Sequence, residues 1–144
     1  MRISLIKTKI KEIEESLNII EEYLPETGEE FLSLGIIKDG IYKRFEFCIE
    51  NLFDICAVLN ADHNLGVPGS DEDIVDNLIR NKILPEEMKE KLGAMKGFRN
   101  IMVHRYGKLD DNLAFNIVSE NLGDFYEFIS LINDHIGRQN SNKQ

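Results

Sequence analysis

Apolar side chains recur every three or four residues along most of this chain, which is the spacing of one face of an α-helix. The clearest runs extend from Ile6 to Leu24 and from Leu122 to Ile136. No segment alternates apolar and polar residues as a half-buried strand does. The 144 residues therefore predict an all-α fold, an antiparallel bundle of four long helices plus one short helix.

Proline, glycine and capping residues predict where these helices begin and end. We expect helices over residues 4–24, 29 or 34 to 59, 71–82, 85 to 104 or beyond, and 110 or 111 to 136. Gly35 and Gly40 stand where the second helix is open to interruption, and Ser70 is placed to cap the short helix. Residues 1–137 are expected to form one domain, and residues 138–144 a flexible polar tail.

Charge is unevenly distributed along the chain, whose formal net charge is −9. Residues 11–30 contain eight Glu and one Lys, whereas residues 89–108 contain six Lys or Arg and a single Glu. The net charge alone argues against nucleic-acid binding, because like charges repel phosphate. The basic segment argues for it, although a solvated helix face would show the same pattern.

Cys48 and Cys56 lie on one predicted helix, about 12 Å apart at the α-helical rise. That separation is too large for a disulfide. We expect two buried free thiols in a reducing cytoplasm. Since no apolar run is long enough to cross a bilayer and no secretory signal opens the chain, we expect no membrane association.

The segment from Phe98 to Tyr106 gathers reactive side chains near the end of a predicted helix: Arg99, Asn100, His104 and Tyr106. A guanidinium matches phosphate oxygens, and an imidazole transfers protons near neutral pH. The two groups suffice for metal-independent cleavage of RNA, with the 2′-hydroxyl as the nucleophile. Arg99 and His104 are about 140° apart on an ideal helix, so they meet only where the helix end unwinds or a second surface closes a cleft. From spacing alone, a structural role for both remains open.

Arg99-x4-His104-x-Tyr106 resembles the Arg-x4-6-His signature of HEPN domains, and its His-x-Tyr ending resembles HepT-like toxins. Asn100 fits the polar residue that commonly follows the arginine there. The likeness covers about residues 3–136 and includes polar positions on the second helix and at the start of the last: Arg44, Glu50, Asp54, and Asp110 or Asp111.

This resemblance implies a ribonuclease toxin of a type VII toxin–antitoxin pair, with Arg99 and His104 catalytic, Asn100 in support, and no metal or cofactor. It implies a homodimer in which motif helices from two subunits face a shared cleft that binds RNA. The implied partner is a minimal nucleotidyltransferase of the MntA type, which transfers AMP from ATP to Tyr106. The adenylate would block RNA by repulsion and bulk.

Polar residues outside the motif are further candidates for a site. Glu50 or Asp54 is placed to orient Arg99 across the bundle, and a plain ion pair with Lys43 or Arg44 is the alternative. His63 and His135 have no His or Cys at ligand spacing, so neither predicts a metal site.

Two other functions remain compatible with the sequence. One is a non-catalytic dimeric HEPN module that serves as a scaffold for a nucleotidyltransferase, which the acidic balance favours. The other is a helical interaction protein in which Arg99 and His104 are polar groups satisfied within the fold.

Overall fold

The computed structural model describes residues 1–105 and 110–142, with the side chains of residues 1–101 and 110–141. Within these ranges the regular structure is helical throughout and contains no strand. Four helices are long and two are short: α1 (Ile3–Tyr23), α2 (Gly28–Leu32), α3 (Ile36–Asp62), α4 (Asp71–Arg80), α5 (Met88–Arg105) and α6 (Asp111–Asn142). The predicted all-α bundle is confirmed.

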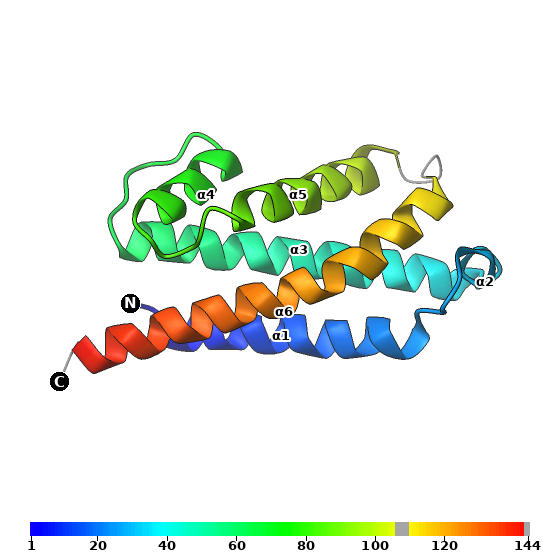
Figure 1. Cartoon of the computed structure of the whole chain (residues 1–144), viewed down its shortest axis with the longest axis horizontal. Coiled ribbons are helices and arrows are strands. Elements are labelled where there is room, and N and C mark those ends of the chain that lie inside the picture. Colours follow the sequence, from blue (N-terminus) through cyan, green and yellow to red (C-terminus); the bar gives the residue numbers. More distant parts are fainter. Residues whose placement is uncertain (106–109, 143–144) are drawn as a thin grey trace.

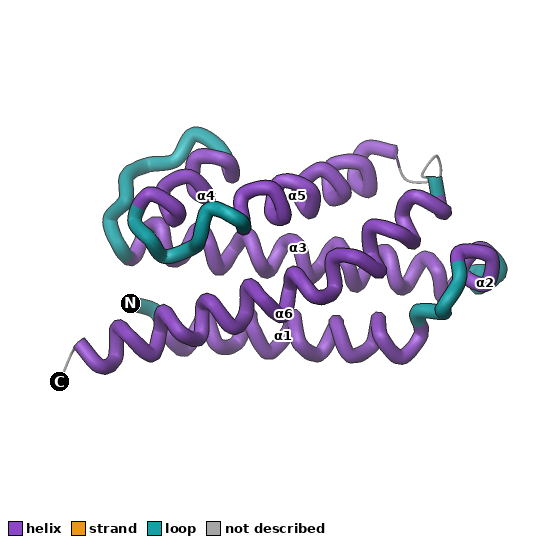
Figure 2. Tube along the Cα trace, in the orientation of Figure 1, coloured by secondary structure: helices purple, strands orange, loops and turns teal. Residues whose placement is uncertain are grey.

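Helix α3 is the centre of the bundle, since it contacts α1 on one side and α4 and α5 on the other. Helix α6 runs along the same axis and contacts α1, α2 and α5 (Figure 1). The loops gather at the two ends of the bundle, with the long α3–α4 loop at one end and α2 at the other (Figure 2). The C-terminal part of α5, which carries the motif, lies at the same end of the bundle as α2.

The apolar spacing explains which faces are buried. The predicted stripe of α1 is confirmed up to Leu24, which follows the helix and is only partly buried. The other five members are 4% exposed or less: Ile6, Ile10, Ile13, Leu17 and Ile20. Phe45 of α3 stacks edge-on against Phe98 of α5 and Phe125 of α6, with ring centroids 4.9 and 5.5 Å apart. Two large apolar side chains of α3 lie outside the core, because Ile37 and Phe47 are 41% and 37% exposed.

The predicted second helix is divided in two. Thr27 caps α2 by accepting a hydrogen bond from the Glu30 amide, and the chain then turns at Gly35. Gly35 has φ +62° and ψ −126°, which a residue with a Cβ rarely adopts. Gly40, the other predicted interruption, lies inside α3 without breaking it.

Three other boundaries differ from those expected. Helix α4 ends at Arg80 rather than at residue 82, and α5 begins at Met88, after a turn in which Pro85 accepts from the Met88 amide. Helix α6 continues to Asn142, beyond the expected end at Ile136. The apolar contacts stop near Ile136, but backbone hydrogen bonds extend the helix through polar residues.

The caps follow the sequence. Ser70 Oγ accepts from the Asp73 amide at 3.2 Å at the start of α4. Asp110 accepts from the amides of Asn112 and Leu113 at the start of α6. Both carry out the N-cap role that short polar side chains favour.

Both cysteines are buried free thiols, as predicted. Burial raises the pKa of Cys48 to about 12 and raises that of Cys56 as well, so neither is an activated nucleophile. No helix in the described part of the chain has the length and apolar character needed to cross a bilayer.

Candidate active site

Phe98 fixes how the motif helix faces the rest of the bundle. Its side chain is 2% exposed and packs against Phe45 and Tyr42 of α3. Because successive helical residues are 100° apart, burying Phe98 turns the next residues toward the surface. The side chain of Arg99 is 33% exposed, and Asn100 is exposed.

The other two motif residues lie partly or wholly beyond the described structure. His104 belongs to the last turn of α5, but its side chain lies outside the described residues. Tyr106 lies outside the described residues altogether. The predicted roles of His104 and Tyr106 therefore stay predictions.

Two carboxylates flank the Arg99 guanidinium without hydrogen-bonding to it. Glu50 Oε1 lies 3.9 Å from Nε, and Asp71 Oδ2 lies 3.8 Å from Nη1. The Nε atom is buried and has no hydrogen-bond partner among the residues that the structure describes. A buried donor without an acceptor costs roughly 1–3 kcal/mol. Arg99 is thus flanked by two carboxylates that do not hydrogen-bond to it, and its buried Nε is a donor that these contacts leave unused.

The two carboxylates predicted to support Arg99 do not act together. Glu50 reaches Arg99, whereas Asp54 pairs with Lys9 of α1 at 3.2 Å. Glu46, one turn before Glu50, pairs with Lys43 at 3.7 Å. Of the predicted pair, only Glu50 lies beside the motif.

Sequence reasoning missed Asp71 as a neighbour of the motif. This residue opens α4, and its Oδ2 atom lies 4.0 Å from Lys96 Nζ as well as 3.8 Å from Arg99. No local spacing signals such a contact, because α4 and α5 meet only through the tertiary packing. The helix-start position was the one property of Asp71 that its sequence context indicated.

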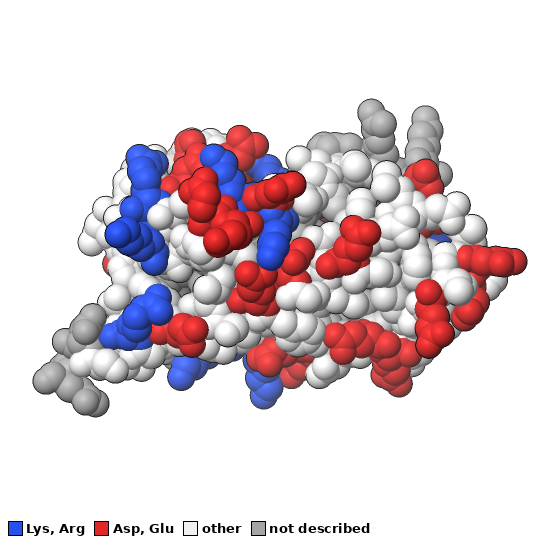
Figure 3. Space-filling model, viewed as in Figure 1, with Lys and Arg blue, Asp and Glu red and all other residues white. Residues whose placement is uncertain are grey.

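Every cation of α5 whose side chain is described has a carboxylate within 4.0 Å. Besides the pairs of Lys96 and Arg99, Lys89 lies 3.1 Å from Asp76 of α4, and Lys91 lies 2.6 Å from Glu127 of α6. Hydrogen bonds with these carboxylates raise the pKa of both lysines. Red and blue atoms accordingly interleave over α4 and α5 in Figure 3. The described part of the basic segment is therefore a paired surface in the fold.

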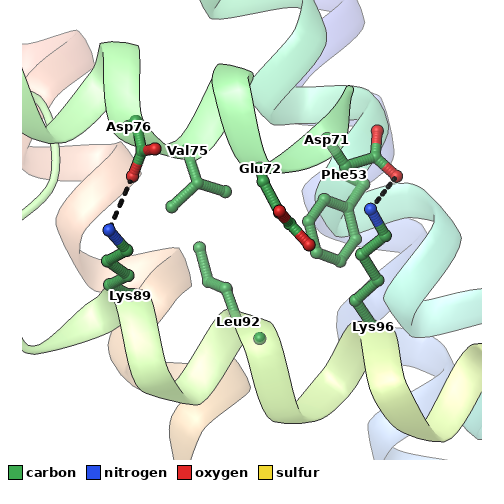
Figure 4. Close-up of a pocket in the computed structure, with 9 residues that line it drawn as sticks. Phe53, Asp71, Glu72, Val75, Asp76, Lys89, Leu92 and Lys96 are labelled. Carbon is green, nitrogen blue, oxygen red and sulfur yellow. Dashed lines mark ion pairs between the residues drawn. The ribbon is translucent and has the colours of Figure 1, made fainter. Parts of the chain in front are cut away.

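A hollow of about 260 Å³ lies between α4 and α5 beside this surface. Its apolar part consists of Phe53, Val75 and Leu92 (Figure 4). The Lys89–Asp76 pair borders one end of the hollow and the Lys96–Asp71 pair the other. Because Asp71 also pairs with Arg99, the hollow adjoins the motif arginine.

The start of α6, which follows the motif in sequence, is hydrogen-bonded to α3. Asp111 accepts hydrogen bonds from Lys38 Nζ, at 2.8 Å, and from the Tyr42 hydroxyl. Burial alone would raise the pKa of Asp111, but these two hydrogen bonds outweigh it and lower the pKa. Asp110 and Asp111 thus share the predicted task of opening the last helix, one as cap and one as anchor.

The structure brings together two histidines that are 72 residues apart in the sequence. His63 Nε2, at the end of α3, lies 2.9 Å from His135 Nε2 on α6. Within the described residues, no group of three His, Cys, Asp or Glu side chains is arranged to hold a metal ion. The pair therefore links two helices by a hydrogen bond.

Comparisons with known proteins agree on one family. A family model described as ribonuclease HepT-like matches residues 13–132. The chain is 29% identical to the mRNA nuclease HepT of Shewanella oneidensis over 128 residues, which cover 89% of this chain and 96% of that protein.

Solved structures give the same assignment. The tri-AMPylated HEPN toxin of Shewanella oneidensis, in complex with the MNT antitoxin, is 28% identical with a TM-score of 0.81, covering 90% of this chain and 97% of that one. A toxin–antitoxin complex with AMP-PNP has a TM-score of 0.83 at 27% identity, covering 91% of this chain and 98% of that one. The predicted resemblance is confirmed: the chain belongs to the ribonuclease HepT-like family.

Proposed function

We propose that this protein is an endoribonuclease toxin that cleaves RNA without a metal ion, with Arg99 and His104 as its catalytic residues. The observation that carries the proposal is Arg99 itself, in a chain of the ribonuclease HepT-like family. Its side chain is 33% exposed, and its Nε has no hydrogen-bond partner among the described residues. A guanidinium can donate hydrogen bonds to a phosphate. Such bonds would be stronger than its present contacts with the carboxylates of Asp71 and Glu50, at 3.8 and 3.9 Å.

The proposed reaction uses the substrate's own 2′-hydroxyl. The 2′-oxygen attacks the adjacent phosphorus. His104 acts either as the general base, which removes the proton of the 2′-hydroxyl, or as the general acid, which protonates the leaving 5′-oxygen. Arg99 stabilises the added negative charge of the pentavalent transition state. The bond to the 5′-oxygen breaks, leaving a 2′,3′-cyclic phosphate and a 5′-hydroxyl end. DNA lacks the nucleophile and is not cut.

The shared cleft of a homodimer is part of the same proposal. Two large apolar side chains are exposed near the motif: Ile101, within it, at 37%, and Leu113, in the first turn of α6, at 53%. Exposed apolar groups beside a polar site suit a surface that a second subunit covers. A two-fold interface there would bring both copies of α5 to one cleft.

The nuclease proposal is tested with purified protein, a single-stranded RNA and excess EDTA. We expect cleavage to 2′,3′-cyclic phosphate ends. His104→Ala should lower the rate roughly 10²–10⁴-fold, and Arg99→Lys should lower it strongly because a point charge lacks the planar fork. Melting temperatures of the variants equal to that of the wild-type protein would show that the loss of activity is not caused by unfolding. RNA left intact by unmodified wild-type protein would contradict the proposal.

We further infer that Tyr106 is the site at which a nucleotidyltransferase partner inactivates the toxin. The related HEPN toxin of Shewanella oneidensis is AMPylated and bound to its MNT antitoxin. Incubation of this protein with ATP and its partner enzyme should add one adenylate or more to the peptide that contains Tyr106. Intact-mass measurement checks this, and a Tyr106→Phe variant that is modified equally well would refute the assignment.

A non-catalytic scaffold for a nucleotidyltransferase is the second candidate. The pairing of the α5 cations with carboxylates favours it, since paired cations attract RNA less. It predicts a partner complex that survives His104→Ala, with no cleavage by the wild-type protein under any condition in which the dimer is intact.

A further inference from the structure

Lys96 and Arg99 hold a single carboxylate oxygen between them. They lie three residues apart on α5 and so share a face, and Asp71 Oδ2 lies 4.0 Å from Lys96 Nζ and 3.8 Å from Arg99 Nη1. Two cations that converge on one anion make an anion-binding arrangement. Here the anion comes from the protein itself.

The internal anion is weakly bound. Neither contact is within hydrogen-bond distance, and the side chains of Lys96, Arg99 and Asp71 are 25%, 33% and 33% exposed. Ion pairs that exposed to water contribute little to stability. A phosphate diester that is free to approach can accept from the guanidinium at about 2.7–2.9 Å. Because Asp71 stays 3.8 Å away, the phosphate is the stronger ligand here.

The surroundings leave room for a nucleotide to replace the carboxylate. Asp71 and Lys96 line the hollow between α4 and α5, whose apolar part is Phe53, Val75 and Leu92 (Figure 4). An Asp71 side chain that turns away from α5 vacates the space beside Lys96. The apolar lining then offers a surface for the sugar or base attached to the incoming phosphate.

We propose that Lys96 and Arg99 together bind a backbone phosphate of the RNA substrate, and that Asp71 occupies this subsite in the free protein as an internal competitor. That the phosphate belongs to RNA rests on the proposed function, whereas the subsite itself rests on the geometry of Lys96, Arg99 and Asp71. Asp71 thereby weakens RNA binding, and Lys96 is a phosphate ligand that acts beside the motif arginine.

The test measures RNA binding rather than cleavage. A fluorescein-labelled single-stranded RNA is titrated with homogeneous protein in EDTA by fluorescence anisotropy, across a series of salt concentrations. All variants carry His104→Ala, so that the RNA stays intact. Asp71→Asn removes the competing charge at constant size, and Lys96→Gln removes the proposed ligand. Glu15→Gln makes the same charge change as Asp71→Asn on an exposed residue of α1, across the bundle from α5.

We expect Asp71→Asn to tighten RNA binding about three- to tenfold, as the loss of two weak ion pairs allows, and Glu15→Gln to change it little. Lys96→Gln should weaken binding and reduce the slope of log affinity against log salt by about one. In the double variant, Lys96→Gln should reduce the gain from Asp71→Asn, because only Arg99 then remains to bind the phosphate. An affinity for Asp71→Asn equal to that of Glu15→Gln, or a salt slope unchanged by Lys96→Gln, would overturn the proposal.

The two proposals fail in different ways. Wild-type protein that leaves RNA intact, while Asp71→Asn tightens binding, overturns the nuclease and supports the subsite. If the wild-type protein cleaves RNA, but Asp71→Asn and Lys96→Gln change RNA affinity no more than Glu15→Gln does, the subsite alone is overturned. A parallel titration with AMP distinguishes the phosphate source, because tightening for AMP without tightening for RNA would assign the site to a free nucleotide and contradict the proposal.

Discussion

Arg99 and His135 illustrate opposite ways in which a polar side chain is accommodated in this bundle. Arg99 keeps a third of its side chain exposed, and its buried Nε meets no acceptor within the described part of the chain. His135 is 5% exposed and has its Nε2 atom 2.9 Å from that of His63. The first arrangement retains a binding capacity that the fold does not use, whereas the second is satisfied by the fold and contributes to its stability.

His135 should make the stability of the protein depend on pH. Burial, with smaller effects of His63 and Arg138, lowers its pKa in the folded state. The unfolded chain therefore binds a proton more readily, near the ordinary value of about 6.5. The stability that neutral His135 provides is complete above that pH and is lost as pH falls through the lowered folded pKa. Urea midpoints should fall on acidification from pH 8 to pH 5.

His135→Gln is the matched variant, because glutamine retains hydrogen-bonding capacity toward His63 but does not titrate. Its urea midpoint should fall less than that of the wild-type protein over the same pH range. An identical fall in both proteins would show that His135 does not account for the acid sensitivity.

At the scale of the helices, periodicity located α1 well because one buried stripe decides its whole length. It left the start of α3 open between residues 29 and 34, because the break at Gly35 depends on a backbone conformation rather than on which residues are apolar. The end of α6 was missed for a related reason: its last turns bury little, so hydrophobic spacing carries no information there. The cations of α5 were visible in the sequence, but their carboxylate partners on α3, α4 and α6 depend on how the helices are packed.

Gly35 and Gly40 give a matched pair of substitutions around this break. Gly40 lies inside α3, and a Cβ added there meets nothing within 4 Å. Gly40→Ala should raise the free energy of unfolding by about 0.5–1 kcal/mol. Gly35 has φ +62°, so Gly35→Ala should lower it by about 1 kcal/mol or more although the site is open. Urea denaturation measures both, and equal effects would contradict the assigned backbone roles.

For the whole molecule, the central question is how a chain of net charge −9 binds a polyanion. Acidic residues dominate the α1 sequence and α4, and α4 neutralises α5 at Lys89, Lys96 and Arg99. Helix α5 therefore offers little unpaired positive charge among its described residues. Two copies of α5 that face one cleft would double the available cations, which is the physical advantage of the proposed dimer.

The dimer proposal makes a prediction about mixed subunits. On an ideal helix, Arg99 and His104 of one chain are about 140° apart, so a shared cleft allows the arginine of one subunit to act with the histidine of the other. Arg99→Ala and His104→Ala homodimers should each be inactive. In a heterodimer of the two variants, the subunit with Arg99→Ala still has His104, and the subunit with His104→Ala still has Arg99. These two wild-type residues can then meet in the shared cleft.

Mixing the inactive variants after reversible dissociation should therefore restore RNA cleavage, measured as 2′,3′-cyclic phosphate ends and compared with each variant treated alone. A mixture of His104→Ala with an Arg99→Ala/His104→Ala double variant is the control, because no cleft then contains a histidine. Activity in the first mixture and none in the second would support pairing of Arg99 and His104 between subunits. If the first mixture stays inactive although mass spectrometry detects the heterodimer, both residues must act within one chain, and the end of α5 must bring them together without help from a second subunit.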